Sequence, residues 1–276
     1  METLNQYSRK VPEITDRHQV IEIPVPGAGQ TVSFDVETFT EVHEIIGIAL
    51  VNPNPLTMGH GTLRLRIGDE EIFPEKFHAD LVSKFSQRFV ATKLEFGFRE
   101  YIFPVKIKAQ GRPTRIQYTE PSDGGKGSLF LYLLGKTNSS NFDVPSYRFQ
   151  VIDITVPKGS NAKDIEIPIE EKTMQSHKMI MGAMFLVPSN RLKQVRLCID
   201  ESTIFPEGMQ GQLVTKELVT KSSIAGGIFT KHIVPFQHLM FPVSQEAKNS
   251  KVEGRIWATP HPDTDYKIYL YLMATL

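Results

Sequence analysis

Alternation of apolar and polar residues with a period of two recurs along the chain. The stretches 32–36 and 63–67 alternate strictly, the second with arginines at its polar positions. Such alternation predicts strands with one face on a core and the other toward solvent. No segment shows a convincing helical stripe, although 76–80 and 82–85 fit a short helical turn. The pattern therefore predicts an all-β protein.

A nearly continuous apolar run, 43–51, predicts a strand covered on both faces, and Asn52-Pro53-Asn54-Pro55 ends it. The strands predicted for the first half are 20–25, 32–36, 43–51, 63–67, 89–98, 101–108, 115–118 and 128–134. Those predicted for the second half are 151–156, 164–169, 179–187, 195–199, 213–219, 233–243, 255–258 and 267–273.

The second half of the chain repeats the first. The stretch Leu63 to Glu75 returns as Val195 to Glu207 with seven of thirteen positions identical. Chance would give about one identity in such a window. Further pairs keep the same order: 19–26 with 150–157, 43–51 with 177–187, 103–105 with 241–243, 115–116 with 255–256 and 131–133 with 270–272.

This duplication predicts an N-terminal arm (1–18), a first jelly roll (19–135), a linker (136–149) and a second jelly roll (150–276). Eight strands per copy suit a jelly roll better than a seven-stranded immunoglobulin sandwich. The predicted fold is all-β, with two tandem eight-stranded jelly-roll sandwiches.

The best-matched element of the repeat ends in Ile-Phe-Pro-Glu. Its residues are Ile72, Phe73, Pro74 and Glu75 in the first copy and Ile204, Phe205, Pro206 and Glu207 in the second. A proline next to a strand end stops the ladder and fixes the direction of the turn. We therefore expect Phe73 and Phe205 to fill equivalent corners of the two sandwiches, which is a structural role.

Composition narrows the choice of partners. Lys plus Arg (31) equals Asp plus Glu (31), so no general attraction to nucleic acid or an anionic membrane is expected. Cys198 is the only cysteine, and Arg66 takes its place in the first copy, which indicates a buried or half-buried thiol without a shared role. No stretch approaches the roughly 18 apolar residues of a membrane span, and residues 1–18 lack the apolar core of a signal peptide. We expect synthesis in a reducing cytoplasm, with release by a route such as lysis if the protein leaves the cell.

The glycine-rich loop 122–127 invites comparison with a phosphate-binding loop. The Walker spacing is absent, the loop leads into a strand, and the second copy has prolines and aspartates (260–265) in its place. A hairpin turn is the favoured interpretation.

The sequence gives little support for a metal site or a catalytic site. The eight histidines are scattered, but His43 and His177 occupy matching positions, which favours a shared packing or hydrogen-bonding role over a metal site. Residues 69–71 with 200–201 could bind calcium, although solvated acidic turns are favoured. No serine sits in a nucleophile elbow and no pair of carboxylates is singled out. We predict no catalytic residue, cofactor or metal, and no enzyme activity.

Aromatic side chains offer one further candidate site. A sugar groove could be lined by Tyr118, Tyr132, Trp257, Tyr269 and Tyr271. Their spacing fits alternating strand faces, which favours core and edge packing.

With its tandem repeat and two eight-stranded units, the chain from Val20 to Leu276 resembles the double jelly-roll major capsid proteins of tailless icosahedral bacteriophages with an internal membrane. That family shares its architecture with the adenovirus hexon. The resemblance implies a homotrimer whose six sandwiches form a pseudo-hexagonal tile of an icosahedral shell. It also implies location in the virion, contacts with other capsid proteins and no specific nucleic acid.

The arm 1–18 carries Arg9, Lys10 and Arg17. Within the capsid hypothesis it reaches a neighbouring capsomer or lipid headgroups of the inner membrane; a disordered terminus is the alternative.

Two other classes of function remain open. A carbohydrate-binding or adhesive tandem sandwich, such as a phage spike or vertex protein, would use Trp257 and nearby tyrosines. An enzyme on a cupin-like jelly roll would need a cluster of histidines and carboxylates, which the sequence does not provide.

Overall fold

A computed structural model of the chain describes residues 17–54, 57–85, 102–137, 147–160, 163–188, 191–217 and 240–276. These residues form two compact units, and the chain passes from the first unit to the second between Tyr147 and Arg148. In this part of the chain the only helical segments are two short 3-10 helices, η1 (Ala79–Leu81) and η4 (Gly211–Leu213). No helix in the described ranges is long and apolar enough to cross a membrane.

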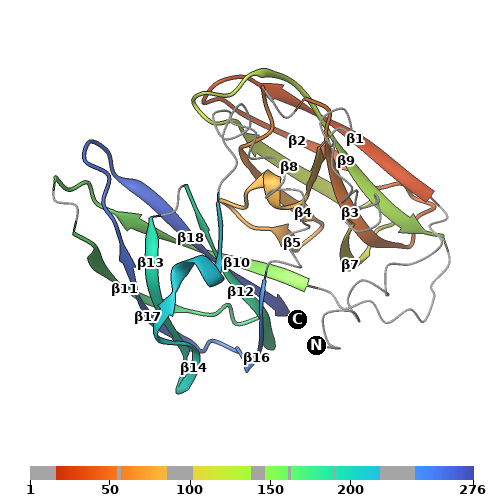
Figure 1. Cartoon of the computed structure of the whole chain (residues 1–276). Helices are drawn as coiled ribbons and strands as arrows, with labels where there is room; N and C mark the ends of the chain where they lie inside the picture. The colour runs from red at the N-terminus through yellow and green to blue at the C-terminus, as the bar shows by residue number, and fades with distance from the viewer. Residues whose placement is uncertain are drawn as a thin grey trace, which may run out of the picture. The chain divides into compact units, whose positions relative to one another are not determined.

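Unit 1 is a sandwich of two sheets (Figure 1). Its strands are β1 (Arg17–Pro26), β2 (Thr31–Glu37), β3 (Glu44–Asn52), β4 (Thr62–Ile67), β5 (Glu70–Phe73), β6 (Ser83–Phe85), β7 (Phe103–Lys108), β8 (Pro113–Thr119) and β9 (Lys126–Lys136). One sheet has the order β1-β9-β3, with β6 and β7 both paired to β3, and the other has the order β2-β8-β4-β5.

Unit 2 repeats this arrangement. Its strands are β10 (Tyr147–Val156), β11 (Ile165–Lys172), β12 (Met179–Val187), β13 (Leu192–Ile199), β14 (Ser202–Gln210), β15 (Thr215–Glu217), β16 (Phe241–Glu246), β17 (Lys251–Ala258) and β18 (Tyr266–Thr275). The sheets are β10-β18-β12, with β15 and β16 both on β12, and β11-β17-β13-β14.

The strand order identifies the fold. Without the three-residue strands β6 and β15, which run parallel to β3 and β12, eight antiparallel strands remain in the described part of each unit. Numbered one to eight, they form sheets of order 1-8-3-6 and 2-7-4-5, which is the jelly-roll arrangement. The predicted all-β fold with two eight-stranded jelly rolls is therefore confirmed.

The hydrophobic pattern predicted which faces are buried. β3 and β12 are buried on both sides along most of their length, as their continuous apolar sequence requires. β4 buries every second residue, so its leucines face the core while Arg64 and Arg66 stay half-exposed. The core of unit 2 gathers aliphatic side chains from both sheets around Phe185 and Phe205.

Several element predictions were wrong. The strands β5 and β14 were not predicted, because their apolar residues do not alternate regularly. The predicted strand 213–219 is confirmed only in part, since Leu213 ends η4 and the strand β15 covers Thr215–Glu217; residues 218–219 lie outside the described residues. β1 begins at Arg17, so Arg17 and His18 belong to the first strand, where they pair with Gly135 and Leu134. β1 starts earlier than predicted because its backbone pairing with β9 includes polar residues that precede the apolar alternation.

Other predictions fall on parts of the chain outside the described residues. These are the strand 89–98, residues 233–239 of the predicted strand 233–243, the greater part of the linker and the arm residues Arg9 and Lys10.

Candidate functional site

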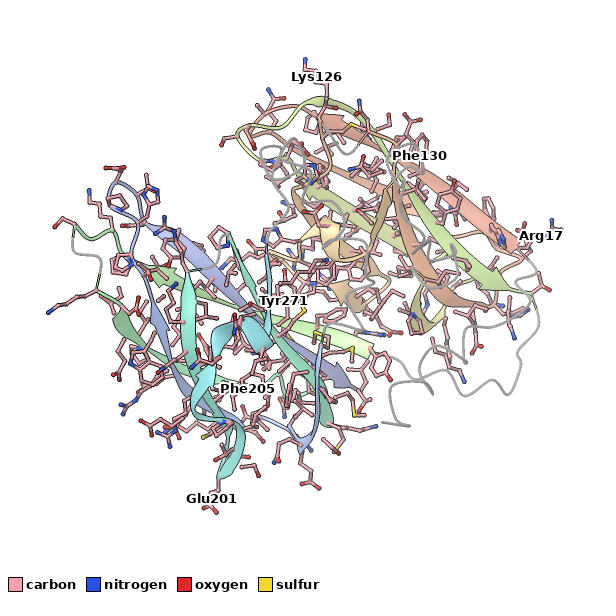
Figure 2. All side chains as sticks on the ribbon, viewed as in Figure 1. Arg17, Lys126, Phe130, Glu201, Phe205 and Tyr271 are labelled. Atoms are coloured by element: carbon pink, nitrogen blue, oxygen red, sulfur yellow. The ribbon has the colours of Figure 1, made fainter. Side chains whose placement is uncertain are left out.

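The repeated Ile-Phe-Pro-Glu element lies at the β4–β5 hairpin of unit 1 and within β14 of unit 2. Phe73 and Phe205 are fully buried, and Figure 2 shows Phe205 in the interior of unit 2. Phe73 stacks on Phe77 at 4.4 Å between ring centroids, and Phe205 meets Phe241 edge-on at 5.2 Å.

The strand end expected at this element is present in only one copy. β5 ends at Phe73, immediately before Pro74, but β14 continues through Pro206 to Gln210. β14 is an edge strand, and its pairing with β13 shifts register around Pro206, so the missing N–H interrupts no regular ladder. The proline ends the strand in unit 1 and lies in an irregular edge in unit 2.

His43 and His177 are not equivalent, which corrects the sequence alignment by one residue. The amide of His43 donates to Lys136, whereas in unit 2 the corresponding amide, bonded to Thr275, is that of Lys178. His177 instead matches Val42. His177 is buried, which lowers its pKa, with Arg148 adding to the shift; His43 is exposed and lies 2.7 Å from Gln110.

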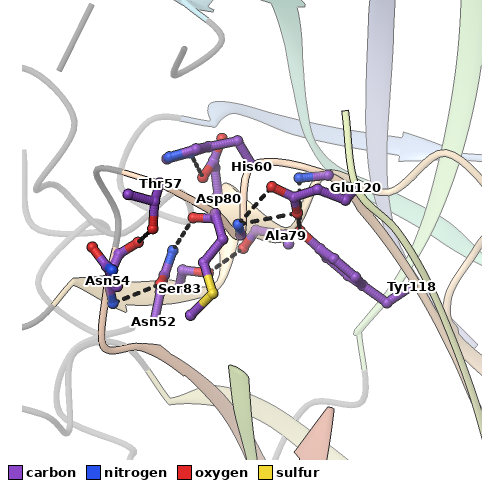
Figure 3. Close-up of polar contacts among 12 residues, drawn as sticks. Asn52, Asn54, Thr57, His60, Ala79, Asp80, Ser83, Tyr118 and Glu120 are labelled. Atoms are coloured by element: carbon purple, nitrogen blue, oxygen red, sulfur yellow. Dashed lines mark hydrogen bonds and ion pairs between the residues drawn. The ribbon is translucent and has the colours of Figure 1, made fainter. Parts of the chain in front are cut away.

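A cluster of buried polar side chains in unit 1 lies where the β3–β4 connection meets η1 and the end of β8 (Figure 3). His60 Nδ1 lies 3.0 Å from Asp80 Oδ1, and both side chains are almost fully buried. The amide of Gly59 donates to both carboxylate oxygens of Glu120, at 3.2 and 3.1 Å. The hydroxyl of Tyr118 donates to Glu120. These bonds tie three separate segments together.

Close backbone contacts explain two glycines at this site. The amide of Gly61 donates to the Tyr118 hydroxyl at 3.0 Å. A Cβ on Gly61 would lie 1.8 Å from the carbonyl oxygen of Thr119, and one on Gly125 would lie 2.5 Å from that of Thr57. The glycine-rich loop packs closely on the β3–β4 connection and leads into β9. Because β8 and β9 lie in different sheets, the loop joins the two sheets and is not the predicted hairpin turn.

Burial shifts the acid–base properties of this cluster. It raises the pKa of Glu120, against the hydrogen bonds from Tyr118 and Gly59. It also raises the pKa of Tyr118, and Glu120 adds to that shift. Buried, mutually bonded groups of this kind stabilise the loops that carry them. Sequence reasoning missed the cluster because its residues come from separate segments and match no motif.

Unit 2 lacks this cluster. The strand register places Ile256 and Ala258 where unit 1 has Tyr118 and Glu120, and the matching 3-10 helices place Gln212 where it has Asp80. The polar cluster is therefore a feature of unit 1 that the shared fold does not require.

His78 gives this end of unit 1 a predicted pH response. Burial lowers the pKa of His78 from 6.5 to about 4, although Asp80 opposes the shift. The unfolded chain takes up a proton near pH 6.5 that the folded unit accepts only near pH 4, so stability is lost as the pH falls through this window. The loss is roughly 3 kcal/mol in full. Glu120 has the opposite sign, since its raised pKa favours the folded state in acid, and it offsets part of the loss.

Urea unfolding at about pH 7 and about pH 4.5 measures this response. His78→Gln, which places in unit 1 the residue found at the matching position 210, should flatten the dependence on pH. His43→Gln is the control on an exposed histidine. Equal pH dependence in wild type and His78→Gln would contradict the assignment.

The other candidate residues serve local structure. Glu71 accepts a hydrogen bond from Arg64 at 2.8 Å, and Asp200 accepts one from the amide of Lys251 at 2.7 Å. Cys198 is half-buried, 3.8 Å from Thr203. Within the described ranges, no group of three or more His, Cys, Asp or Glu could hold a metal ion.

The aromatic residues considered for a sugar groove are buried or lie in different sheets. Tyr118 and Tyr271 are fully buried. Tyr271 lies on β18 (Figure 2) between Leu270 and Leu272, which belong to the core of unit 2. Trp257 is on β17, whereas Tyr269 is on β18 in the other sheet of that unit. The structure therefore favours the packing interpretation of these side chains.

Comparisons with known proteins give structural matches only. No protein-family model matches the chain, and neither does any curated protein sequence. The solved structures that match include the major capsid protein P2 from bacteriophage PM2, with 11% identity over 94% of this chain and 98% of that chain and a TM-score of 0.42. PBCV-1 VP54, fitted into a reconstruction of the virophage Sputnik, matches with 9% identity over 95% and 94% of the two chains and a TM-score of 0.38. At these scores the jelly-roll assignment rests on the strand order itself.

Proposed function

We propose that the protein is a structural major capsid protein, which forms homotrimers that tile an icosahedral shell. The observation that carries this proposal is the presence in one chain of two jelly rolls with the same strand order. Three such chains would supply six similar sandwiches, enough for a pseudo-hexagonal tile without six identical chains. The protein would then be located in the virion after synthesis in the host cytoplasm.

The candidate site supports a building block more than a catalyst. Its buried polar groups are bonded to one another and hold loops in place. Partners would be further copies of the chain and other capsid proteins. The arm before β1, with Arg9 and Lys10, would reach a neighbouring capsomer or the inner membrane, with Arg17 at the point where the strand begins.

Light scattering coupled to size exclusion tests this proposal. We expect a stable species of three times the chain mass of 31.2 kDa. Electron microscopy of concentrated trimer, or of cells that express the protein, should show pseudo-hexagonal tiles or closed shells. A chain that stays monomeric at high concentration would contradict the proposal.

A further inference from the structure

Each unit exposes one large apolar side chain at the same place. Phe39 is 42% exposed and Met174 is 39% exposed. Each lies two residues beyond the end of its unit's second strand, after Glu37 in unit 1 and after Lys172 in unit 2. An exposed phenylalanine or methionine is unremarkable alone, but its repetition after the duplication indicates a shared use.

A buried glutamine holds each of these residues in position. Gln19 donates to the carbonyl of Glu37 at 2.8 Å and accepts from the amide of Phe39 at 3.2 Å. Gln150 makes the same two bonds, with Lys172 at 2.7 Å and Met174 at 3.1 Å.

Between the two residues that each glutamine bonds lies a buried threonine, Thr38 in unit 1 and Thr173 in unit 2. The amide of Thr38 donates to Arg112, and that of Thr173 donates to Ser250. The backbone that presents the exposed side chain is therefore fixed from both sides, so little conformational entropy would be lost when a partner covers it.

The charges around the two positions have opposite signs. We define the Phe39 surface as Phe39 with Glu37 and Glu41, and the Met174 surface as Met174 with Lys172, Lys178 and Lys248; all seven side chains are exposed. At matching positions, Glu37 is replaced by Lys172, Glu41 by Ser176, His43 by Lys178 and Gln110 by Lys248.

Each surface also has some neighbouring residues of the opposite charge. Lys108 and Arg112 lie near the Phe39 surface, where Glu44 adds to the acidic side, and Glu246 lies near the Met174 surface. The lysines of the Met174 surface still outnumber its acidic neighbours. An exposed apolar side chain with acidic neighbours is therefore a better partner for one surrounded by lysines than for a second copy of itself.

We propose that the Phe39 surface of one copy docks on the Met174 surface of the next copy. This contact is heterologous, because different patches meet, and a heterologous contact that closes on itself builds a ring. The inference rests on the proposed capsomer and adds to it the residues through which its three chains join.

Charge reversal tests the contact in the full-length chain. Glu37→Lys with Glu41→Lys, and separately Lys172→Glu with Lys178→Glu, should each weaken trimer formation at least tenfold, as measured by light scattering across a dilution series. All four substitutions together should restore the trimer, because the signs are again opposite. Phe39→Ser and Met174→Ser should also weaken it. Exposed positions are changed throughout, and circular dichroism checks that each variant is folded.

The outcomes separate this inference from the proposed function. If wild type and all variants form trimers equally well, the contact is overturned and the proposed capsomer stands. The same holds if the variant with all four charge reversals fails to recover the trimer. A wild-type chain that never trimerises contradicts the capsomer and the contact together. Binding to anionic lipid vesicles that is lost in Phe39→Ser, with an unchanged trimer, would assign the surface to a membrane and overturn the second copy as its partner.

Discussion

Replacing Phe73 by alanine is expected to destabilise unit 1 by about 4 kcal/mol. Phe73 is fully buried, stacks on Phe77 at 4.4 Å and lies 5.7 Å from the ring of Phe103. Loss of the ring removes apolar contacts on several sides and leaves a cavity in a well-packed corner. Chemical unfolding followed by circular dichroism measures the change.

The duplication provides a matched variant in unit 2. Phe205→Ala should cost about 3 kcal/mol, because its edge-on neighbour Phe241 is 36% exposed and water can reach the vacated space more easily. Trp257 is the single tryptophan and lies in unit 2, so its fluorescence follows that unit. Phe130→Ala, on a half-buried ring of β9, is the control and should cost about 1 kcal/mol. Equal losses in all three variants would contradict the packing role.

Replacing Asp80 by alanine is expected to cost unit 1 about 3 to 5 kcal/mol. The substitution leaves the buried ring of His60 without the carboxylate that lies 3.0 Å from its Nδ1. Asp80→Asn keeps the volume and a polar partner, so it should cost less than half as much. Urea unfolding near neutral pH gives both values.

An exposed ion pair is the control for this prediction. Arg115 and Asp35 lie 3.7 Å apart with both side chains mostly exposed, so Asp35→Ala should change stability by less than about 1 kcal/mol. A double-mutant cycle between Asp80→Ala and His60→Ala isolates the coupling of the buried pair. A coupling no larger than that of Asp35 with Arg115 would contradict a stabilising role for the buried pair.

The sequence predicted the architecture because burial in a sandwich leaves a record in the residue pattern. Alternation in 32–36 and 63–67 marked half-buried strands, and the continuous run at 43–51 marked a central strand. The repeat of Leu63–Glu75 predicted a second copy, and the two units have the same strand order. Both signals are local or periodic, so one sequence is enough to detect them.

Features that depend on pairing between distant strands were not predictable. β5 and β14 are both edge strands, but β5 ends before Pro74 whereas β14 continues through Pro206 with a shifted register on β13, and such pairing is decided by the whole unit. The apparent match of His43 with His177 fails by one residue because hydrogen-bond register, and not residue identity, defines equivalence.

By itself, then, the sequence determined the fold class, the duplication and the faces of most strands, because these follow from the periodic burial of apolar residues. Only the tertiary structure brought His60, Asp80, Tyr118 and Glu120 into one buried cluster, and only it placed Phe39 and Met174 on equivalent, glutamine-held positions. Such groupings join segments up to some sixty residues apart through side-chain hydrogen bonds, for example from Gly59 to Glu120. Folding creates those contacts, and no spacing along the chain encodes them.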